Sequence, residues 1–186
     1  MNYQQAGGGS GVKVITVLMM WLVLVPAVMA QTALPSTGPV IEGFGPVFEV
    51  ADDALTLDEG VAYKVSMDVS ASDQSVSSRN RHLESAARFL NMHPENKITF
   101  ALVVHGSATQ DLLTDSAFKE RFQAPNPSTA LLNALSRAGV SIILCGQSAA
   151  YKGYAPEDLH PGVSMAMSAM TAHVLLQRQG YTLIPF

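Results

Sequence analysis

The sequence predicts a three-layer α/β fold, in which a mostly parallel β-sheet has helices on both faces. Strand-like and helix-like segments alternate along residues 61–184, one strand-like segment is a continuous apolar run, and a glycine follows two of the predicted helices. Strands that alternate with helices of about 10 to 15 residues are typical of βαβ units, which join parallel strands. A continuous apolar run indicates a strand buried on both faces, as in a parallel sheet.

The first strand is predicted over residues 61–70, where apolar and polar side chains alternate as in a strand with one buried and one wetter face. The period then changes to that of an amphipathic helix over about residues 78–92. The helical spacing is carried by Leu83, Ala86, Ala87 and Leu90. Pro94 ends this helix, because proline cannot continue the backbone hydrogen-bond pattern.

The second strand is predicted over the apolar run of residues 98–104, and a short helix follows near residues 115–122. Ser128 can cap the next helix. The inward face of that helix consists of Leu131, Leu132 and Leu135. Gly139 supplies the left-handed residue that ends it, directly before a strand over residues 140–144.

The C-terminal part repeats this pattern. Residues 163–167 predict a short strand, and a helix over about residues 168–179 stops at Gly180 before a last strand over residues 181–184.

The first thirty residues have the features of a secretory signal peptide. Lys13 is their one charged residue, an apolar run covers residues 14–30, and Val28 and Ala30 are the small residues of a cleavage site. The alternative is a membrane anchor, but Pro26 interrupts the run, which is shorter than the roughly 20 residues that span a bilayer. We therefore expect cleavage after Ala30 and a periplasmic or secreted protein without membrane attachment.

The remaining chain is predicted to form one domain. Residues 31–59 are rich in proline and glycine and read as an extended arm, and the α/β domain covers residues 60–186. Loss of Lys13 changes the formal net charge from −4 to −5, so no basic surface is available for nucleic acid.

Three polar residues lie near the carboxyl ends of the predicted strands: Asp68, His105 and Cys145. In open α/β sheets ligands bind outside these ends. Asp68 and His105 also have ordinary roles available, since an aspartate there can form a turn or cap and a histidine can bond a loop carbonyl. The five histidines lack metal-site spacing, so no metal or other cofactor is predicted.

Cys145 is the only cysteine and cannot form an internal disulfide. In an oxidising compartment it is buried and inert, paired with another chain, or reactive. Gly146 and a helix-like start at Gln147 follow it, and the dipole and backbone donors of a helix start favour a thiolate. The alternative is a packed core side chain, the common environment of a free cysteine.

Four segments resemble the DsrE/DsrF-like family: YKVSMDVS at 63–70, ALVVHGSAT at 101–109, AGVSIILCGQSAAYKG at 138–153 and LQRQGYTLIPF at 176–186. The resemblance covers residues 38–186 and points to the exported, single-domain branch. It implies a flavodoxin-like fold and homotrimers or homohexamers. Met165, Met167 and Met170 offer flexible apolar surface for such assembly. In the cytoplasmic relay members, a cysteine carries sulfane sulfur as a persulfide. Cys145 matches a cysteine frequent in the family, and His105 matches the histidine of its VHG segment.

The first functional interpretation is therefore a sulfurtransferase-like sulfur carrier. Cys145 would accept sulfur or a thiol group from a donor and pass it to an acceptor protein or small thiol, with His105 tuning its protonation. Gly146 would let a perthiol approach the backbone, Gln147 would donate a hydrogen bond to the terminal sulfur, and Asp68 would contribute to binding. The alternative is a non-enzymatic small-ligand-binding or assembly protein with a structural cysteine.

Overall fold

The computed structural model describes residues 7, 34–51, 54–73 and 75–185. The chain divides into Met1–Thr32 and Ala33–Phe186, and the fold belongs to the second unit. The predicted signal peptide lies outside the described residues except for Gly7. Within the described ranges, no helix is long and apolar enough to cross a membrane.

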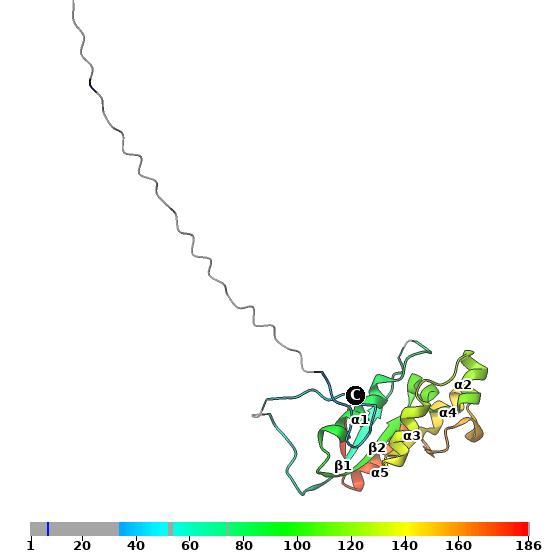
Figure 1. Cartoon of the computed structure of the whole chain (residues 1–186). Helices are drawn as coiled ribbons and strands as arrows, with labels where there is room; N and C mark the ends of the chain where they lie inside the picture. Colours follow the sequence, from blue (N-terminus) through cyan, green and yellow to red (C-terminus); the bar gives the residue numbers. More distant parts are fainter. Residues whose placement is uncertain (1–6, 8–33, 52–53, 74, 186) are drawn as a thin grey trace, which may run out of the picture. The chain divides into compact units, whose positions relative to one another are not determined.

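The predicted α/β fold is confirmed as a five-stranded parallel sheet in the order β4-β3-β2-β1-β5. The strands are β1 (Ala62–Val69), β2 (Lys97–Val104), β3 (Ser141–Cys145), β4 (Val163–Ala166) and β5 (Thr182–Ile184). The helices are α1 (Arg81–Met92), α2 (Asp115–Phe122), α3 (Thr129–Arg137), α4 (Gly146–Lys152) and α5 (Ala169–Arg178), with short 3₁₀ helices η1 (Gly106–Leu112) and η2 (Pro156–Asp158) (Figure 1). Each predicted strand therefore lies within a residue or two of its expected range.

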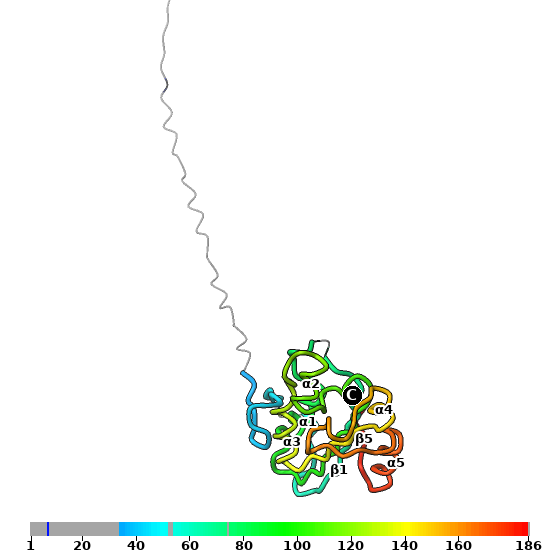
Figure 2. Tube along the Cα trace, turned by 90° about the vertical axis from the view of Figure 1, so that its right-hand side faces the viewer, coloured from blue at the N-terminus to red at the C-terminus, as the bar shows by residue number. Residues whose placement is uncertain are grey.

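The helices cover both faces of the sheet. α1 and α3 pack on one face with the larger apolar core, and α5 packs on the other through Ala169, Ala172 and Leu176. Figure 2 shows α1 and α3 on one side of the strands and α5 on the opposite side. α5 lies on the opposite face because of the order of the strands. Strands β2, β3 and β4 follow one another toward one edge of the sheet, whereas the connection that contains α5 runs back from β4 to β5 at the other edge. A right-handed connection must then lie on the opposite face.

Alternation along β1 determines which side chains face α5. Val65, Met67 and Val69 belong to the larger core, so Ser66 and Asp68 point to the α5 side. The sequence predicts that this side of β1 is wetter, but Ser66 is fully buried. It is buried because α5 packs on this face of the sheet and β5 pairs with β1 beside it.

Part of the predicted arm packs on the domain. Ile41 is buried, and the carboxamide of Asn91 in α1 accepts from the backbone N–H groups of Val40 and Ile41 at 3.1 and 2.7 Å. The same carboxamide donates to carbonyls of the segment, including that of Phe44 at 2.9 Å. The residues around position 40 run beside α1 and α3 in Figure 2. Residues 34–51 and 54–59 contain no long strand or helix, but side chains of α1 hydrogen-bond to the backbone of this segment.

The helix ends follow the predictions except at the starts of α3 and α1. Gly139 and Gly180 have positive φ angles of 80° and 84°, as expected of residues that end helices. Ser128 is the N-cap residue of α3, as predicted, but its side chain makes no capping hydrogen bond. Its hydroxyl instead accepts from the backbone N–H of Asn80 at 3.4 Å, because the start of α1 lies against it. Asn80 caps α1, which begins at Arg81 rather than at residue 78.

Candidate functional site

The carboxyl edge of the sheet brings the three predicted polar residues together. Asp68, His105 and Cys145 line one cavity of about 540 Å³, together with Gln147. The register of the sheet explains this, since Asp68 pairs with Val103, and Val104 pairs with Leu144 directly before Cys145. The remaining lining residues are Ser168, Ala169, Met170, His173, Leu183 and Pro185. The cavity is therefore built from strand ends on one side and from α5 and the C-terminal segment on the other.

The thiol of Cys145 lies among hydrogen-bond donors. The residue is 6% exposed. Burial raises the pKa of the thiol, but hydrogen bonds from the Ser148 hydroxyl and from the backbone N–H groups of Ser148, Ala169 and Gln147 outweigh this and hold the pKa below its ordinary value. The donors come from the first turns of α4 and α5. Cys145 is thus a buried residue at a cavity wall whose environment favours the thiolate.

Ser148 connects the thiol to the segment after β2. Its hydroxyl oxygen accepts from the backbone N–H of Gly106 at 3.3 Å. The hydroxyl hydrogen is then free to be donated to the sulfur of Cys145. Gly106 has a φ of 58°, and a Cβ at this position would lie 2.5 Å from the carbonyl oxygen of Ser70. Glycine is therefore needed here to bring this N–H group beside Ser148.

A carboxylate between two imidazoles forms the other polar part of the cavity. Nε2 of His105 lies 3.1 Å from each of the two carboxylate oxygens of Asp68, and Nε2 of His173 lies 2.7 Å from Oδ1 of the same carboxylate. All three side chains are partly exposed. The turn or capping role considered for Asp68 is wrong. Its carboxylate instead contacts the side chains of His105, directly after β2, and of His173 in α5.

These contacts assign the hydrogen positions. A carboxylate only accepts hydrogen bonds, so Nε2 of both His105 and His173 must carry a hydrogen. Nδ1 of His173 is buried and has no hydrogen-bond partner among the described residues.

The predicted site residues His105, Gln147 and Gly146 differ in how they relate to the thiol of Cys145. No hydrogen bond joins His105 to Cys145 in the described part of the chain, and the Nε2 atom of His105 contacts Asp68. Gln147 lines the cavity and donates its backbone N–H to the thiol. Gly146 has a packing role, because a Cβ there would lie 2.8 Å from the carbonyl oxygen of Ala166.

The sequence reasoning missed His173 and Ser148. His173 lies 105 positions from Asp68, and only the return crossover to β5 places α5 over the end of β1. The helical spacing of Ala169, Ala172 and Leu176 could have indicated His173. These apolar residues define the buried face of α5, and His173 lies on that face. For Ser148, no spacing pattern reveals a contact with the backbone of Gly106.

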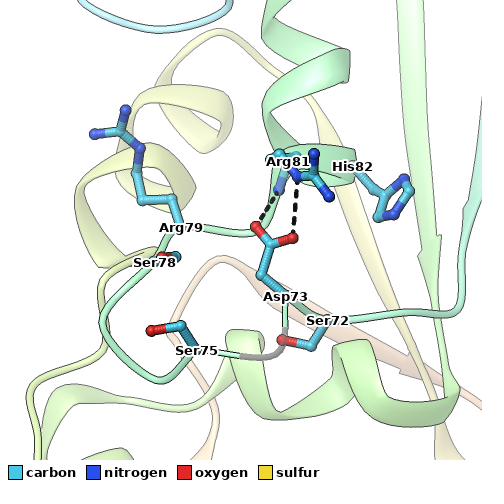
Figure 3. Close-up of a pocket in the computed structure, with 7 residues that line it drawn as sticks. All are labelled: Ser72, Asp73, Ser75, Ser78, Arg79, Arg81 and His82. Atoms are coloured by element: carbon cyan, nitrogen blue, oxygen red, sulfur yellow. Dashed lines mark hydrogen bonds and ion pairs between the residues drawn. The ribbon is translucent and has the colours of Figure 1, made fainter.

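A second, larger cavity of about 680 Å³ is polar and lies at the start of α1. Its lining residues are Ser72, Asp73, Ser75, Ser78, Arg79, Arg81 and His82 (Figure 3). Arg81 donates through Nε and its backbone N–H to Asp73 at 3.1 and 3.3 Å, and Arg79 pairs with Glu84 at 3.3 Å. Its arginines are therefore already paired within the protein.

Comparisons with known proteins agree with this architecture. The model of the DsrE/DsrF-like family matches residues 64–186. Among solved structures, the chain is similar to MTH1491, a protein of unknown function from Methanobacterium thermoautotrophicum, with 21% identity and a TM-score of 0.54 over 67% of this chain and 99% of that chain. It is also similar to the ychN protein from E. coli, with 16% identity and a TM-score of 0.48 over the same shares. No curated protein matches the chain.

Proposed function

Because the chain belongs to the DsrE/DsrF-like family, which is linked to sulfur relay, we propose that it carries sulfane sulfur as a persulfide on Cys145. The observation that carries this proposal is the thiol itself. It borders a cavity, and the pKa of Cys145 is held below its ordinary value by donors from two helix starts. A nucleophilic thiolate is the species that attacks sulfane sulfur.

The loading step is a displacement at sulfur. The thiolate of Cys145 attacks the terminal sulfur of a donor R–S–SH, in which R is carbon or a further sulfur chain. A new S–S bond forms at Cys145, the S–S bond of the donor breaks, and R–S⁻ leaves with the electron pair. The terminal sulfur keeps its oxidation level, so the step needs no added oxidant or reductant.

The discharge step returns the protein to its starting state. The thiolate of an acceptor attacks the terminal sulfur, and Cys145 leaves as the thiolate. The donors from Ser148, Gln147 and Ala169 stabilise that leaving group as they stabilise the attacking thiolate during loading. The exposed side chain of Gln147 is available to donate to the terminal sulfur of the persulfide.

The setting proposed for this activity is an exported homo-oligomer. Export rests on the predicted signal peptide with cleavage after Ala30. Assembly is supported by exposed apolar side chains on β4, on α5 and on the segment between them: Met165, Met167, Met170, Val174 and Leu175. We propose a homotrimer or homohexamer, with a sulfur donor or acceptor protein or a small thiol as the further partner.

Intact mass spectrometry tests the proposal. The purified protein is incubated with inorganic polysulfide, the excess is removed, and the mass is recorded under non-reducing conditions. We expect a gain of one sulfur atom that dithiothreitol reverses and that Cys145→Ser abolishes. A wild-type protein that keeps its unmodified mass would contradict the persulfide proposal.

The low exposure of Cys145 favours one second candidate, a binding protein for a small ligand with a structural cysteine. Most of the cavity wall is apolar, with Ala169, Met170, Leu183 and Pro185 among its lining residues. The same experiment separates the two functions. In the binding protein, Cys145 would gain no sulfur, and Cys145→Ser would leave ligand binding intact.

A further inference from the structure

We propose that His105 is the base that removes the proton from the acceptor thiol during discharge, and that Asp68 and His173 position it. This inference rests on the proposed function, because it assigns roles within the same sulfur-transfer site. His105 thereby acts on the incoming thiol rather than on Cys145.

The position of His105 beside Cys145 makes it accessible to an incoming thiol. It lies directly after β2, beside the end of β3 where Cys145 lies, and both residues line the cavity. Adjacent parallel strands are about 4.8 Å apart, so a thiol in the cavity that approaches a persulfide on Cys145 also approaches the imidazole. The side chain of His105 is 32% exposed, which leaves it accessible to such a thiol.

The hydrogen bonds of His105 determine which of its ring nitrogens can take a proton. Nε2 is committed to Asp68, and that nitrogen must carry a hydrogen because the carboxylate only accepts. Nδ1 makes no hydrogen bond to the described residues and is not among their buried unpaired atoms. Asp68 therefore selects the form of His105 in which Nδ1 has a lone pair available to take a proton.

His173 holds Asp68 in place. Its Nε2–H donates to Oδ1 of Asp68 at 2.7 Å, shorter than either contact of His105 with the carboxylate. The ring is largely buried and lies on the face of α5 that packs on the sheet. The carboxylate is thus fixed between β1 and α5 by a side chain that does not need to reach the substrate. His173 is a positioning residue for His105.

The step balances in atoms and charge. The acceptor R′–SH gives its proton to Nδ1 of His105, and the resulting R′–S⁻ attacks the terminal sulfur of the Cys145 persulfide. The S–S bond at Cys145 breaks, Cys145 leaves as the thiolate, and the product is R′–S–SH. The imidazolium then loses its proton to solvent, which restores the starting state. The electrostatic attraction between the imidazolium and Asp68 stabilises the transfer.

The test compares two acceptors of different acidity with the polysulfide-loaded protein. An alkyl thiol such as 2-mercaptoethanol is protonated at neutral pH and needs a base, whereas an acidic aryl thiol such as 4-nitrothiophenol is already a thiolate. Polysulfide is used for loading because its leaving group needs no proton. We measure the rate at which the persulfide mass of the protein disappears with each acceptor.

For His105→Ala, we expect discharge to the alkyl thiol to slow by at least about tenfold, with loading and discharge to the aryl thiol unchanged within about twofold. Asp68→Asn is expected to slow the alkyl reaction in the same way, because an amide no longer fixes the tautomer of His105. His173→Ala is expected to have a smaller effect of about threefold to tenfold on the same step. His173→Gln should restore the rate, because its amide N–H₂ can donate to Asp68. His93→Ala, which changes a histidine outside the cavity, is the matched control.

The outcomes separate this inference from the proposed function. A wild-type protein that does not load with sulfur would overturn the proposed function itself. Normal loading with equal slowing for both acceptors in His105→Ala would overturn the inference, since that pattern shows a structural effect on the site. Unchanged discharge in His105→Ala or failure of His173→Gln to restore the rate would also overturn the roles assigned here.

Discussion

The cavity at Cys145 and the cavity at the start of α1 differ in what their polar groups contact. The cavity at the start of α1 is larger, about 680 Å³ against 540 Å³, and it contains two arginines. Its arginines pair with carboxylates, Arg81 with Asp73 inside the cavity (Figure 3) and Arg79 with Glu84 outside its lining. In the Cys145 cavity, the donors converge on one thiol, and the pKa of Cys145 is lowered.

This difference teaches that neither the volume nor the charge of a cavity distinguishes the one to which we assign the proposed thiol chemistry. The polar cavity continues into a buried network, in which Asp111 accepts from Ser72 at 3.1 Å and from the carboxamide of Asn80 at 2.6 Å. That network holds the loop after β1 against the start of α1. We therefore expect changes near the polar cavity to affect stability and changes near Cys145 to affect thiol chemistry.

The largest predicted effect comes from Gly106, beside the Cys145 cavity. Gly106→Ala introduces both a left-handed alanine and a Cβ 2.5 Å from the Ser70 carbonyl oxygen. We expect a loss of about 2 to 5 kcal/mol in the free energy of unfolding, measured by urea denaturation. Gly139→Ala is the matched control, since Gly139 has a φ of 80° and no atom within 4 Å of the added Cβ. Its expected loss is about 1 to 2 kcal/mol. Equal losses would contradict the close approach of Gly106 to Ser70.

The second prediction concerns Asp111 in the network behind the polar cavity. Burial raises the pKa of Asp111 from 3.8 to about 6, although hydrogen bonds from Asn80 and Ser72 lower it in part. Between these two values the folded protein binds more protons at this group than the unfolded chain does. The contribution of Asp111 to stability is therefore present below pH 3.8 and is lost as the pH rises through about 6.

Urea denaturation between pH 4 and pH 7 measures this dependence. We expect wild type to lose up to about 3 kcal/mol more than Asp111→Asn over this range, because the variant has no group to titrate at this position. The comparison with the variant removes the contributions of all other groups. Parallel pH profiles for the two proteins would contradict the raised pKa of Asp111.

The third prediction returns to the Cys145 cavity. Ser148→Ala removes the hydroxyl that donates to the thiol, so we expect a higher pKa of Cys145 and alkylation about tenfold slower at neutral pH. Ser164→Ala is the control, because the Ser164 hydroxyl bonds the Ile142 carbonyl instead. An unchanged alkylation rate in Ser148→Ala would show that the backbone donors alone determine the thiol's reactivity.

The smallest effect is expected at Arg81 in the polar cavity. Its side chain is 82% exposed, so its ion pair with Asp73 is screened by water. Arg81→Ala should change the free energy of unfolding by less than about 1 kcal/mol and should not change the alkylation rate of Cys145. Slower alkylation in this variant would mean that the two cavities are coupled.

Periodicity in the sequence predicts the sheet, its parallel strands and the positions of the helices. It also predicts that Asp68, His105 and Cys145 meet, because parallel strands end at one edge. Secondary structure and burial are predicted best, because they depend on the pattern of neighbouring residues along the chain.

Long-range contacts limit the rest of the prediction. The contact of His173 with Asp68 depends on which face the last crossover takes. The contact of Ser128 with Asn80, rather than with its own helix, depends on how α3 packs against the start of α1. Cys145 and His105 are neighbours in the cavity without a shared hydrogen bond, and the imidazole instead contacts Asp68 through Nε2, a contact between residues 37 positions apart.

The pH dependence of alkylation tests most directly whether Cys145 is a reactive thiolate at the cavity wall. The folded protein is treated with iodoacetamide across a pH series, and the modified fraction is followed by mass spectrometry. We predict a rate midpoint below the ordinary thiol pKa of about 8.5, and we predict that His105→Ala leaves this midpoint unchanged. Labelling that occurs only after denaturant is added would show that Cys145 is a buried structural residue and would contradict the sulfur-carrier account.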